Sequence, residues 1–254
     1  MIVSILNQKG GVGKTTASVH LAYAFAVAGR KTLLIDLDPQ ANAGTTFFEE
    51  LPKTGTIREP MLDRRYDIRE SVYQAHEDGV VVPNLFIIPA NIHLEAAERN
   101  IYAMPHREKI LKNQLKKIER DYDFILVDCP PRLNQLTINA IYAADLLLIP
   151  TVLDRYSLDG ISDLFTTIEE VKEGEFPHYL IFKNAYDSRE KKSNDLAESI
   201  LRDLENHICV TAIRRTSLFK QAQQHNQTLF AYDPKSPACE DFINLSKEIT
   251  SYAL

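Results

Sequence analysis

Residues 9–16 read Lys9-Gly10-Gly11-Val12-Gly13-Lys14-Thr15-Thr16, and they closely follow the apolar stretch Ile2-Val3-Ser4-Ile5-Leu6. The apolar stretch predicts a buried strand, and the alanine-rich residues after Thr16 predict a helix. Glycines adopt positive φ and carry no side chain, so successive backbone N–H groups of such a loop can surround an anion. The order strand, glycine loop, helix therefore predicts a phosphate-binding loop and a bound nucleotide.

The side chains of this loop supply the chemistry. Lys14 places a positive charge beside the β- and γ-phosphates, and the Thr15 hydroxyl is suited to bind Mg²⁺. The usual pattern has a glycine where this chain has Gln8, and a second lysine, Lys9, follows it. An ordinary glycine turn is the competing interpretation. The predicted nucleotide-binding residues of the loop are Gly10, Gly11, Val12, Gly13, Lys14, Thr15 and Thr16.

Two further apolar segments end in acidic residues. The first, residues 31–38, contains Leu-Leu-Ile before Asp36 and Asp38, and the second, residues 124–128, ends at Asp128. Uninterrupted apolar residues predict strands buried on both faces, as in a parallel sheet. Ligands of open α/β sheets bind at the carboxyl ends of the strands. Asp128 is therefore predicted to hold Mg²⁺, directly or through water, as a Walker B carboxylate does.

Strands and helices alternate along the rest of the chain, which predicts an α/β fold with one doubly wound, mainly parallel sheet and helices on both faces. Residues 41–84 are the least regular part, and we expect switch-like or capping segments there. No linker or repeat interrupts residues 1–254, which we expect to form a single domain. The remaining predicted strands are 85–90, 146–150, 179–184 and 208–213, and the predicted helices include 16–28, one from 105, 160–171, 195–204 and one from 237.

Composition narrows the class of protein. The net charge of −6 argues against a surface covered in positive potential, although a local basic patch remains open. No run approaches the about eighteen apolar residues of a membrane span, and no signal-peptide pattern begins the chain, so a cytoplasmic location is expected. The three cysteines lack a C-x-x-C spacing and are expected to be reduced core thiols.

The two lysines that flank Gly10-Gly11-Val12-Gly13, followed by Thr15-Thr16, resemble the deviant Walker A loop of the ParA/MinD family of P-loop ATPases. The similarity covers nearly the whole chain and implies a P-loop NTPase fold, ATP and Mg²⁺. Segments similar to the family's also occur at 36–42 after the second strand, 128–131 as Walker B and switch II, 136–140, 186–189 and 232–236.

The resemblance also implies roles for single residues. By that resemblance, Lys9 reaches the phosphates of the partner subunit in an ATP-dependent homodimer, and Asp38 orients the attacking water. Together with Lys14 they form the catalytic set of a weak Mg²⁺-dependent ATPase. Asn184, at the end of its strand, contacts adenine. The competing interpretations are a solvated loop lysine for Lys9 and a turn carboxylate for Asp38.

The implied function is that of a DNA-partition ATPase, in which the ATP-bound dimer binds DNA non-specifically and a ParB-like centromere-binding partner stimulates hydrolysis. Such a protein associates with the nucleoid, and its cargo is a chromosome or a plasmid. Ile213-Arg214 stands where the family usually has Ile-Pro, and Leu218 stands where it has a basic residue. Candidate DNA-binding residues, with ordinary surface charges as the alternative, are Arg214, Arg215, Lys220, Lys235 and Lys247.

Two alternatives remain open. A MinD-like membrane-recruited switch ends in a basic amphipathic helix, whereas residues 244–254 contain one lysine and one glutamate, so no membrane partner is expected. A metabolic ATP-dependent enzyme on the same fold is the second alternative, because a fold does not fix a function. Family members that act as site-specific repressors carry a helix-turn-helix before the first strand, and none is expected before Ile2.

Overall fold

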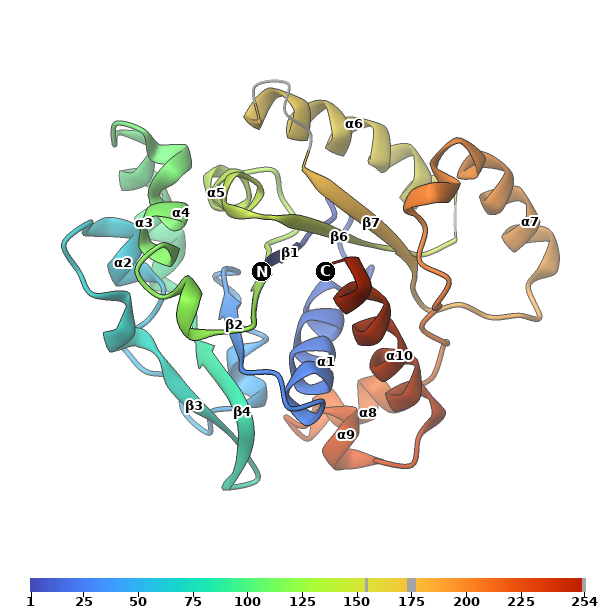
Figure 1. The fold of residues 1–254 in the computed structure, drawn as a ribbon, viewed down its shortest axis with the longest axis horizontal. Coiled ribbons are helices and arrows are strands. Elements are labelled where there is room, and N and C mark those ends of the chain that lie inside the picture. Colours follow the sequence, from blue (N-terminus) through green and yellow to red (C-terminus); the bar gives the residue numbers. More distant parts are fainter. Residues whose placement is uncertain (154, 173–176, 253–254) are drawn as a thin grey trace.

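A single sheet forms the centre of the molecule (Figure 1). The computed structural model describes residues 1–153, 155–172 and 177–252. Within these residues seven strands pair in the order β3-β4-β2-β5-β1-β6-β7, and only the β3–β4 pair is antiparallel. The predicted mainly parallel sheet is confirmed. The strands are β1 (Ile2–Ile5), β2 (Thr32–Asp36), β3 (Tyr73–Glu77), β4 (Val80–Ile88), β5 (Phe124–Asp128), β6 (Leu146–Thr151) and β7 (His178–Lys183).

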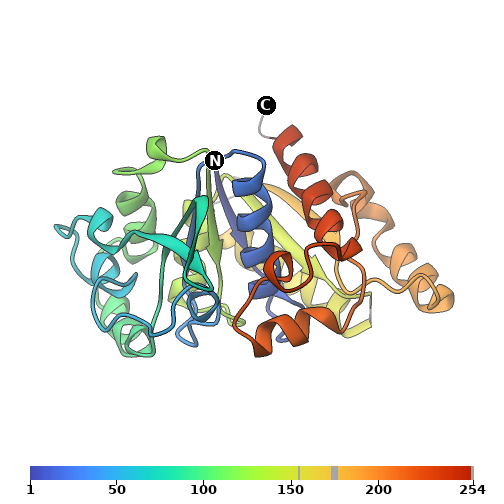
Figure 2. The same ribbon diagram turned by 90° about the horizontal axis from the view of Figure 1, so that it is seen from below.

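Helices cover both faces of the sheet, as predicted (Figures 1 and 2). Helices α1 and α10 pack on one face, and α3, α4, α5 and α6 contribute to the other layer. The helices are α1 (Lys14–Val27), α2 (Arg58–Leu62), α3 (His93–Tyr102), α4 (Ile110–Leu115), α5 (Gln135–Ala143), α6 (Arg155–Val171), α7 (Lys191–Ile200), α8 (Leu218–Gln224), α9 (Leu229–Tyr232) and α10 (Pro237–Tyr252). Residues 253 and 254 of the tail lie outside the described residues.

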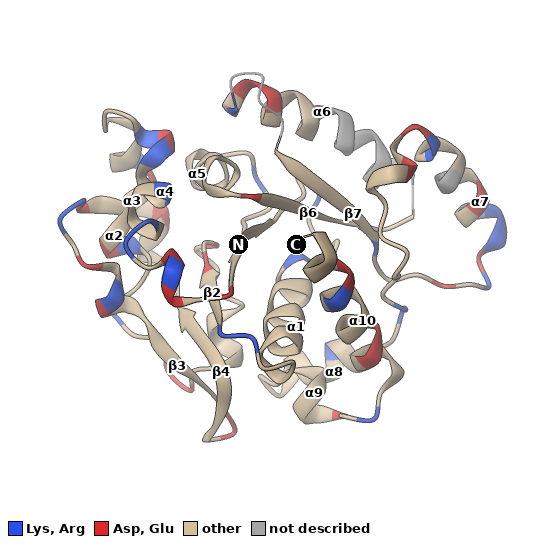
Figure 3. Cartoon of the chain, viewed as in Figure 1, with Lys and Arg blue, Asp and Glu red and all other residues tan. Residues whose placement is uncertain are grey.

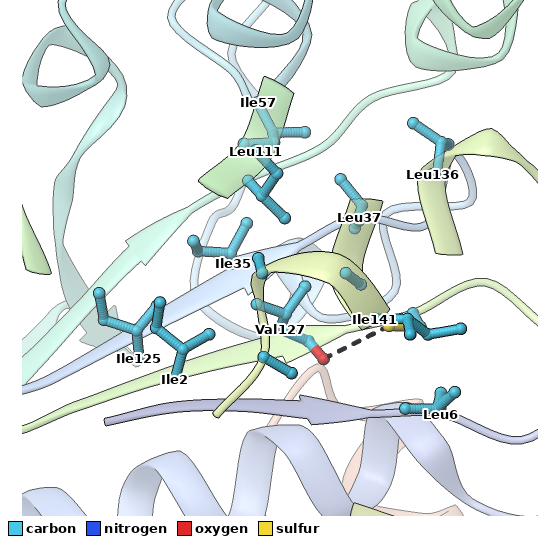
Figure 4. Close-up of a cluster of buried hydrophobic side chains, with 14 of the residues drawn as sticks. Ile2, Leu6, Ile35, Leu37, Ile57, Leu111, Ile125, Val127, Leu136 and Ile141 are labelled. Carbon is cyan, nitrogen blue, oxygen red and sulfur yellow. Dashed lines mark hydrogen bonds between the residues drawn. The ribbon is translucent and has the colours of Figure 1, made fainter. Parts of the chain in front are cut away.

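Alternating residues of each central strand enter two different cores. In β2, Leu33 and Ile35 pack with the α3–α6 layer, whereas Leu34 packs with α1 and α10. Figure 4 shows part of the first core, including Ile35 and Val127 of neighbouring strands. Both faces of β1, β2, β5 and β6 are fully buried, which explains their uninterrupted apolar sequences.

Residues 41–84 contain more regular structure than the sequence analysis expected. β3 and β4 form a hairpin whose two-residue turn is Asp78-Gly79, with Glu77 paired to Val80. Asp78 and Gly79 have φ of 50° and 73°, as a type I′ turn requires. The strand predicted to begin at residue 85 therefore begins at Val80. An Asp-Gly pair directly before three valines, residues 80–82, was the available signal.

The prediction of a strand at 208–213 was wrong. Two isolated bridges take its place, Ile181 with Ile208 and Tyr186 with Arg214. Between them, the backbone N–H groups of Val210 and Thr211 donate to the two carboxylate oxygens of Glu248 on α10, at 2.7 and 3.0 Å. For these two residues a side chain replaces a neighbouring strand as the acceptor, whereas Cys209 and Ile213 still donate to carbonyls of β7.

Candidate nucleotide-binding site

The phosphate loop connects β1 to α1 at the carboxyl edge of the sheet. Gly11 and Gly13 have φ of 76° and 85°, in the left-handed region that favours glycine. No described side chain caps the N-terminus of α1, and the free N–H groups of a helix's first turn point outward from that end, here toward the loop. A Cβ atom on Gly10 or Gly11 would meet nothing within 4 Å. The loop is therefore an open backbone cradle of the kind that binds phosphate.

Lys14 lies inside this loop. Its Nζ donates a hydrogen bond to the carbonyl of Lys9 at 3.0 Å, and burial lowers its pKa against the opposing effect of Asp128. The loop begins at a fixed point, because Asn7 accepts a hydrogen bond from the Lys9 backbone at 2.9 Å and donates one to the Pro150 carbonyl at 2.9 Å. Lys9 itself is half-buried at the start of the loop.

Asp128 is fully buried at the end of β5, close to the first turns of α1. Its Oδ1 accepts a hydrogen bond from the Ser18 hydroxyl at 2.8 Å, whereas Oδ2 has no hydrogen-bond partner among the described residues. Burial raises the pKa of Asp128 to about 6, although the Ser18 and Thr15 hydroxyls lower it. A buried carboxylate oxygen without a partner, next to the loop threonine, fits an oxygen-seeking cation such as Mg²⁺.

Asp36 is a buried carboxylate beside the site whose structural role the sequence analysis missed. It is paired in register with Asp128 on the neighbouring strand and is fully buried. Its Oδ1 accepts from the backbone N–H of Asp38 at 3.1 Å and its Oδ2 from that of Gly44 at 2.9 Å. Burial, and then the charge of Asp128, raise the pKa of Asp36 well above its usual value. Its place at the end of a buried strand was the only signal in the sequence.

Asp38 follows β2 and is 9% exposed. Its Oδ1 accepts a hydrogen bond from the backbone N–H of Gln40 at 2.9 Å. It lines a cavity of about 310 Å³ together with Pro130, Pro131 and Arg132, which follow β5. The structure therefore places Asp38 where the ends of β2 and β5 meet, at the same edge of the sheet as the phosphate loop.

Asn184 approaches the phosphate loop from the end of β7. Its backbone N–H donates to the Thr151 carbonyl at 2.8 Å. Its side-chain Nδ2 donates to the Val12 carbonyl at 2.6 Å, a contact between residues 172 positions apart. The sequence analysis placed Asn184 near the nucleotide through the resemblance alone and did not foresee this bond.

The predicted DNA-binding residues lie on or beside α8 and α10 and are exposed. Arg214 donates to both carboxylate oxygens of Asp241, at 2.6 and 2.7 Å, and Arg215 pairs with Glu190 at 3.2 Å. Figure 3 shows acidic residues beside basic ones along α10 and α7. Carboxylates thus offset two of the five predicted charges. The other three are Lys220, Lys235 and Lys247.

His20 on α1 is a further buried polar residue that the sequence did not single out. Its Nδ1 lies 2.7 Å from the Thr16 carbonyl, and its Nε2 accepts a hydrogen bond from the Leu229 N–H at 2.8 Å. The ring is therefore neutral with its proton on Nδ1, and burial lowers its pKa to about 4. Beside it, the buried carboxylate of Glu77 accepts hydrogen bonds from the backbone and hydroxyl of Thr228.

None of the helices in the described ranges is both long and apolar enough to cross a lipid bilayer.

Comparison with known proteins places these features in a family. Residues 1–179 match a family model described as an AAA domain. The chain is 35% identical to the chromosome partitioning protein ParA of Myxococcus xanthus, with 98% of this chain and 87% of the relative covered. It is 33% identical to the sporulation initiation inhibitor protein Soj of Bacillus subtilis, with 98% of each chain covered.

A solved structure shows the same fold. Cobyrinic acid a,c-diamide synthase from Mycobacterium smegmatis, with bound ADP and magnesium, superposes with a TM-score of 0.78 and 26% identity, covering 98% of this chain and 93% of that one. The near full-length similarity agrees with the site itself, which has a loop with two lysines and acidic residues at the ends of β2 and β5. The chain belongs to the ParA and Soj family of P-loop partition ATPases.

Proposed function

We propose that this protein is a DNA-partition ATPase that binds ATP with Mg²⁺, closes as a homodimer and binds DNA without sequence specificity. The observation that supports it most is the meeting of the two-lysine phosphate loop with Asp128 and Asp38 at one edge of the sheet. The similarity to ParA and Soj over nearly the whole chain selects partition among the functions of this fold.

Each site residue has a role in this proposal. Lys14 neutralises the β- and γ-phosphates, and the backbone of residues 10–16 holds them. Thr15 and Asp128 hold Mg²⁺, which neutralises phosphate charge when bound. Asp38 orients the attacking water, and Lys9 reaches the phosphates bound by the partner subunit. Phosphoryl transfer depends mainly on positioned charge, so a lysine supplied by a second subunit makes hydrolysis depend on dimerisation.

The DNA surface consists of exposed basic side chains near α8 and α10. Lys220, Lys235 and Lys247 carry its charge, because Asp241 and Glu190 offset Arg214 and Arg215. Contacts of this kind go to phosphates and carry no sequence information, so binding weakens with salt. The ATP-bound dimer lies on the nucleoid between turnovers, and a ParB-like partner stimulates hydrolysis and thereby releases the dimer from DNA.

A gel-shift experiment tests the proposal. Two unrelated DNA duplexes are incubated with the protein and ATP, ADP or no nucleotide, at low and moderate salt. Both duplexes should shift with ATP only, less at moderate salt, and not with Lys14→Ala. Lys53→Ala removes an equal charge from an exposed loop and should bind like the wild type. The triple variant K220A/K235A/K247A should keep ATP binding and lose DNA binding.

A metabolic ATP-dependent enzyme is the second candidate, because the synthase with bound ADP and magnesium is 26% identical and shares the fold. Tight ATP binding without any DNA shift, under every condition above, would reject the partition function and favour this candidate. ATP-dependent sedimentation with lipid vesicles would instead favour a MinD-like membrane switch.

A further inference from the structure

Asn184 contacts the phosphate loop from a different strand. Its Nδ2 donates to the Val12 carbonyl at 2.6 Å, in the centre of the loop. The Asn184 backbone is itself held by the Thr151 carbonyl of β6, so the side chain extends from a fixed point of the sheet. A residue of another strand therefore supports the loop just before α1 begins at Lys14.

The same side chain also packs against the next loop residue. A Cβ atom on Gly13 would lie 2.4 Å from Nδ2 of Asn184, which is closer than real Cβ atoms approach. Gly13 has a φ of 85°, so its conformation also favours glycine. The asparagine and the glycine thus fit together, with a hydrogen bond to one residue and a close contact with its neighbour.

We infer that Asn184 is a positioning residue that braces the phosphate loop and so contributes to phosphate binding, independently of any contact with the base. Its Nδ2 donates to Val12, and the resemblance described above assigns the same residue to adenine. One side chain would then connect the base to the phosphates. The inference rests on the nucleotide-binding part of the proposed function and does not involve DNA or a partner protein.

An asparagine that acts only on the base makes a different prediction. Its removal would weaken ATP binding but leave the loop and the binding of a base-free polyphosphate unchanged. The brace predicts that both change. The two roles are therefore separated by a probe that lacks the base and by a measurement on the loop itself.

The experiment compares wild type with Asn184→Ala and Asn184→Asp. Asp keeps the shape but places an oxygen against the Val12 carbonyl, so it cannot donate. Asn194→Ala is the matched control, because Asn194 is buried and donates from Nδ2 to the Asp187 carbonyl at 3.0 Å, away from the phosphate loop. Thermal unfolding identifies any variant that fails to fold.

Two readouts are measured. The first is amide hydrogen exchange of residues 7–16 in the nucleotide-free protein, and the second is competition of magnesium tripolyphosphate with a fluorescent ATP analogue. Both Asn184 variants should exchange faster in this segment, and their affinity for tripolyphosphate should fall about tenfold, the usual effect of one hydrogen bond. Asn194→Ala should match the wild type in both.

Unchanged loop exchange in folded Asn184→Ala would overturn the inference, and so would a loss of ATP affinity without any loss for tripolyphosphate. The exchange measurement needs no ligand, so it tests the brace even where tripolyphosphate binds too weakly for its affinity to be measured. The gel-shift result is independent of both readouts. Failure of the brace and failure of the partition function are thus distinguishable.

Discussion

Asp38 owes its position to a residue that is two places earlier in the chain. Asp36 receives the N–H of Asp38 on one oxygen and that of Gly44 on the other, and so closes the segment between them. A single buried carboxylate thus determines where the proposed water-orienting side chain lies. The competing interpretation of Asp38 as a turn carboxylate also has support, since its Oδ1 accepts from the N–H of Gln40.

Substitution of Asp38 by alanine separates these interpretations. The variant should bind ATP and dimerise normally but hydrolyse ATP at least about 100-fold more slowly, the usual scale for a group that handles the attacking water. Single-turnover hydrolysis and light scattering measure the two properties. Asp63→Ala is the control, because Asp63 accepts from the N–H of Arg65 in a turn of the same kind away from the site. Normal turnover in Asp38→Ala would assign Asp38 to the turn alone.

Gly13 offers a second test at the scale of one residue. Gly29 has a similar positive φ of 78° but open space around it, whereas a Cβ on Gly13 would collide with Asn184. Gly29→Ala should lower the free energy of unfolding by about 1 kcal/mol from backbone strain. Gly13→Ala should cost more and also abolish nucleotide binding. Chemical denaturation and ATP titration of both variants measure the difference, and equal effects would remove the steric argument.

At the scale of elements, the hairpin β3–β4 is attached to the distant α8–α9 segment. Glu77, at the end of β3, is 6% exposed and accepts hydrogen bonds from the backbone and hydroxyl of Thr228. Thr228 caps the N-terminus of α9. Burial raises the pKa of Glu77, because the charged carboxylate loses hydration in the protein interior. The hydrogen bonds from Thr228 partly offset this loss.

Removal of this carboxyl group should loosen the connection. Glu77→Ala leaves the buried N–H and hydroxyl of Thr228 without their acceptor and should lower the free energy of unfolding by about 2 kcal/mol. Glu77→Gln keeps one acceptor and should cost less than half as much. Urea denaturation gives both values. A Gln variant as unstable as the Ala variant would mean that the negative charge, rather than hydrogen bonding, holds the two elements together.

The parts of the site that were predictable are those that local sequence encodes. The phosphate loop and the acidic ends of β2 and β5 follow from runs of apolar residues, glycines and carboxylates that are adjacent in the chain. The bond between Asn184 and Val12 joins residues 172 positions apart, so no local pattern could reveal it. The interruption of the strand predicted at 208–213 was hidden for the same reason, because Glu248, the acceptor for Val210 and Thr211, comes from a later helix.

At the scale of the whole molecule, His20 joins the first turns of α1 to α9. The ring is neutral when folded because burial lowers its pKa to about 4, whereas an unfolded histidine titrates near 6.5. Between these pH values the unfolded chain binds a proton that the folded chain does not. Stability from this group is therefore complete above pH 6.5 and lost toward pH 4, by up to about 3 kcal/mol.

The measurement is the free energy of unfolding from pH 7 to 4 for wild type and His20→Phe. Asp128 acts in the opposite direction, because burial raises its pKa to about 6 in the folded state. The informative quantity is therefore the difference between the two proteins. Wild type should lose stability relative to His20→Phe as the pH falls. Parallel curves would show that His20 binds its proton at the same pH in the folded and the unfolded protein.

The fixed tautomer of His20 also makes the ring a natural spectroscopic reporter. We expect a proton held on Nδ1 against the Thr16 carbonyl, in a buried position, to exchange slowly with solvent and to give a resonance well separated from the amide region. Thr16 belongs to the phosphate loop, and Leu229 is the first residue of α9, which lies between α8 and α10 in the chain. One unlabelled proton can therefore follow, in solution, whether nucleotide binding changes the contact between these two helices.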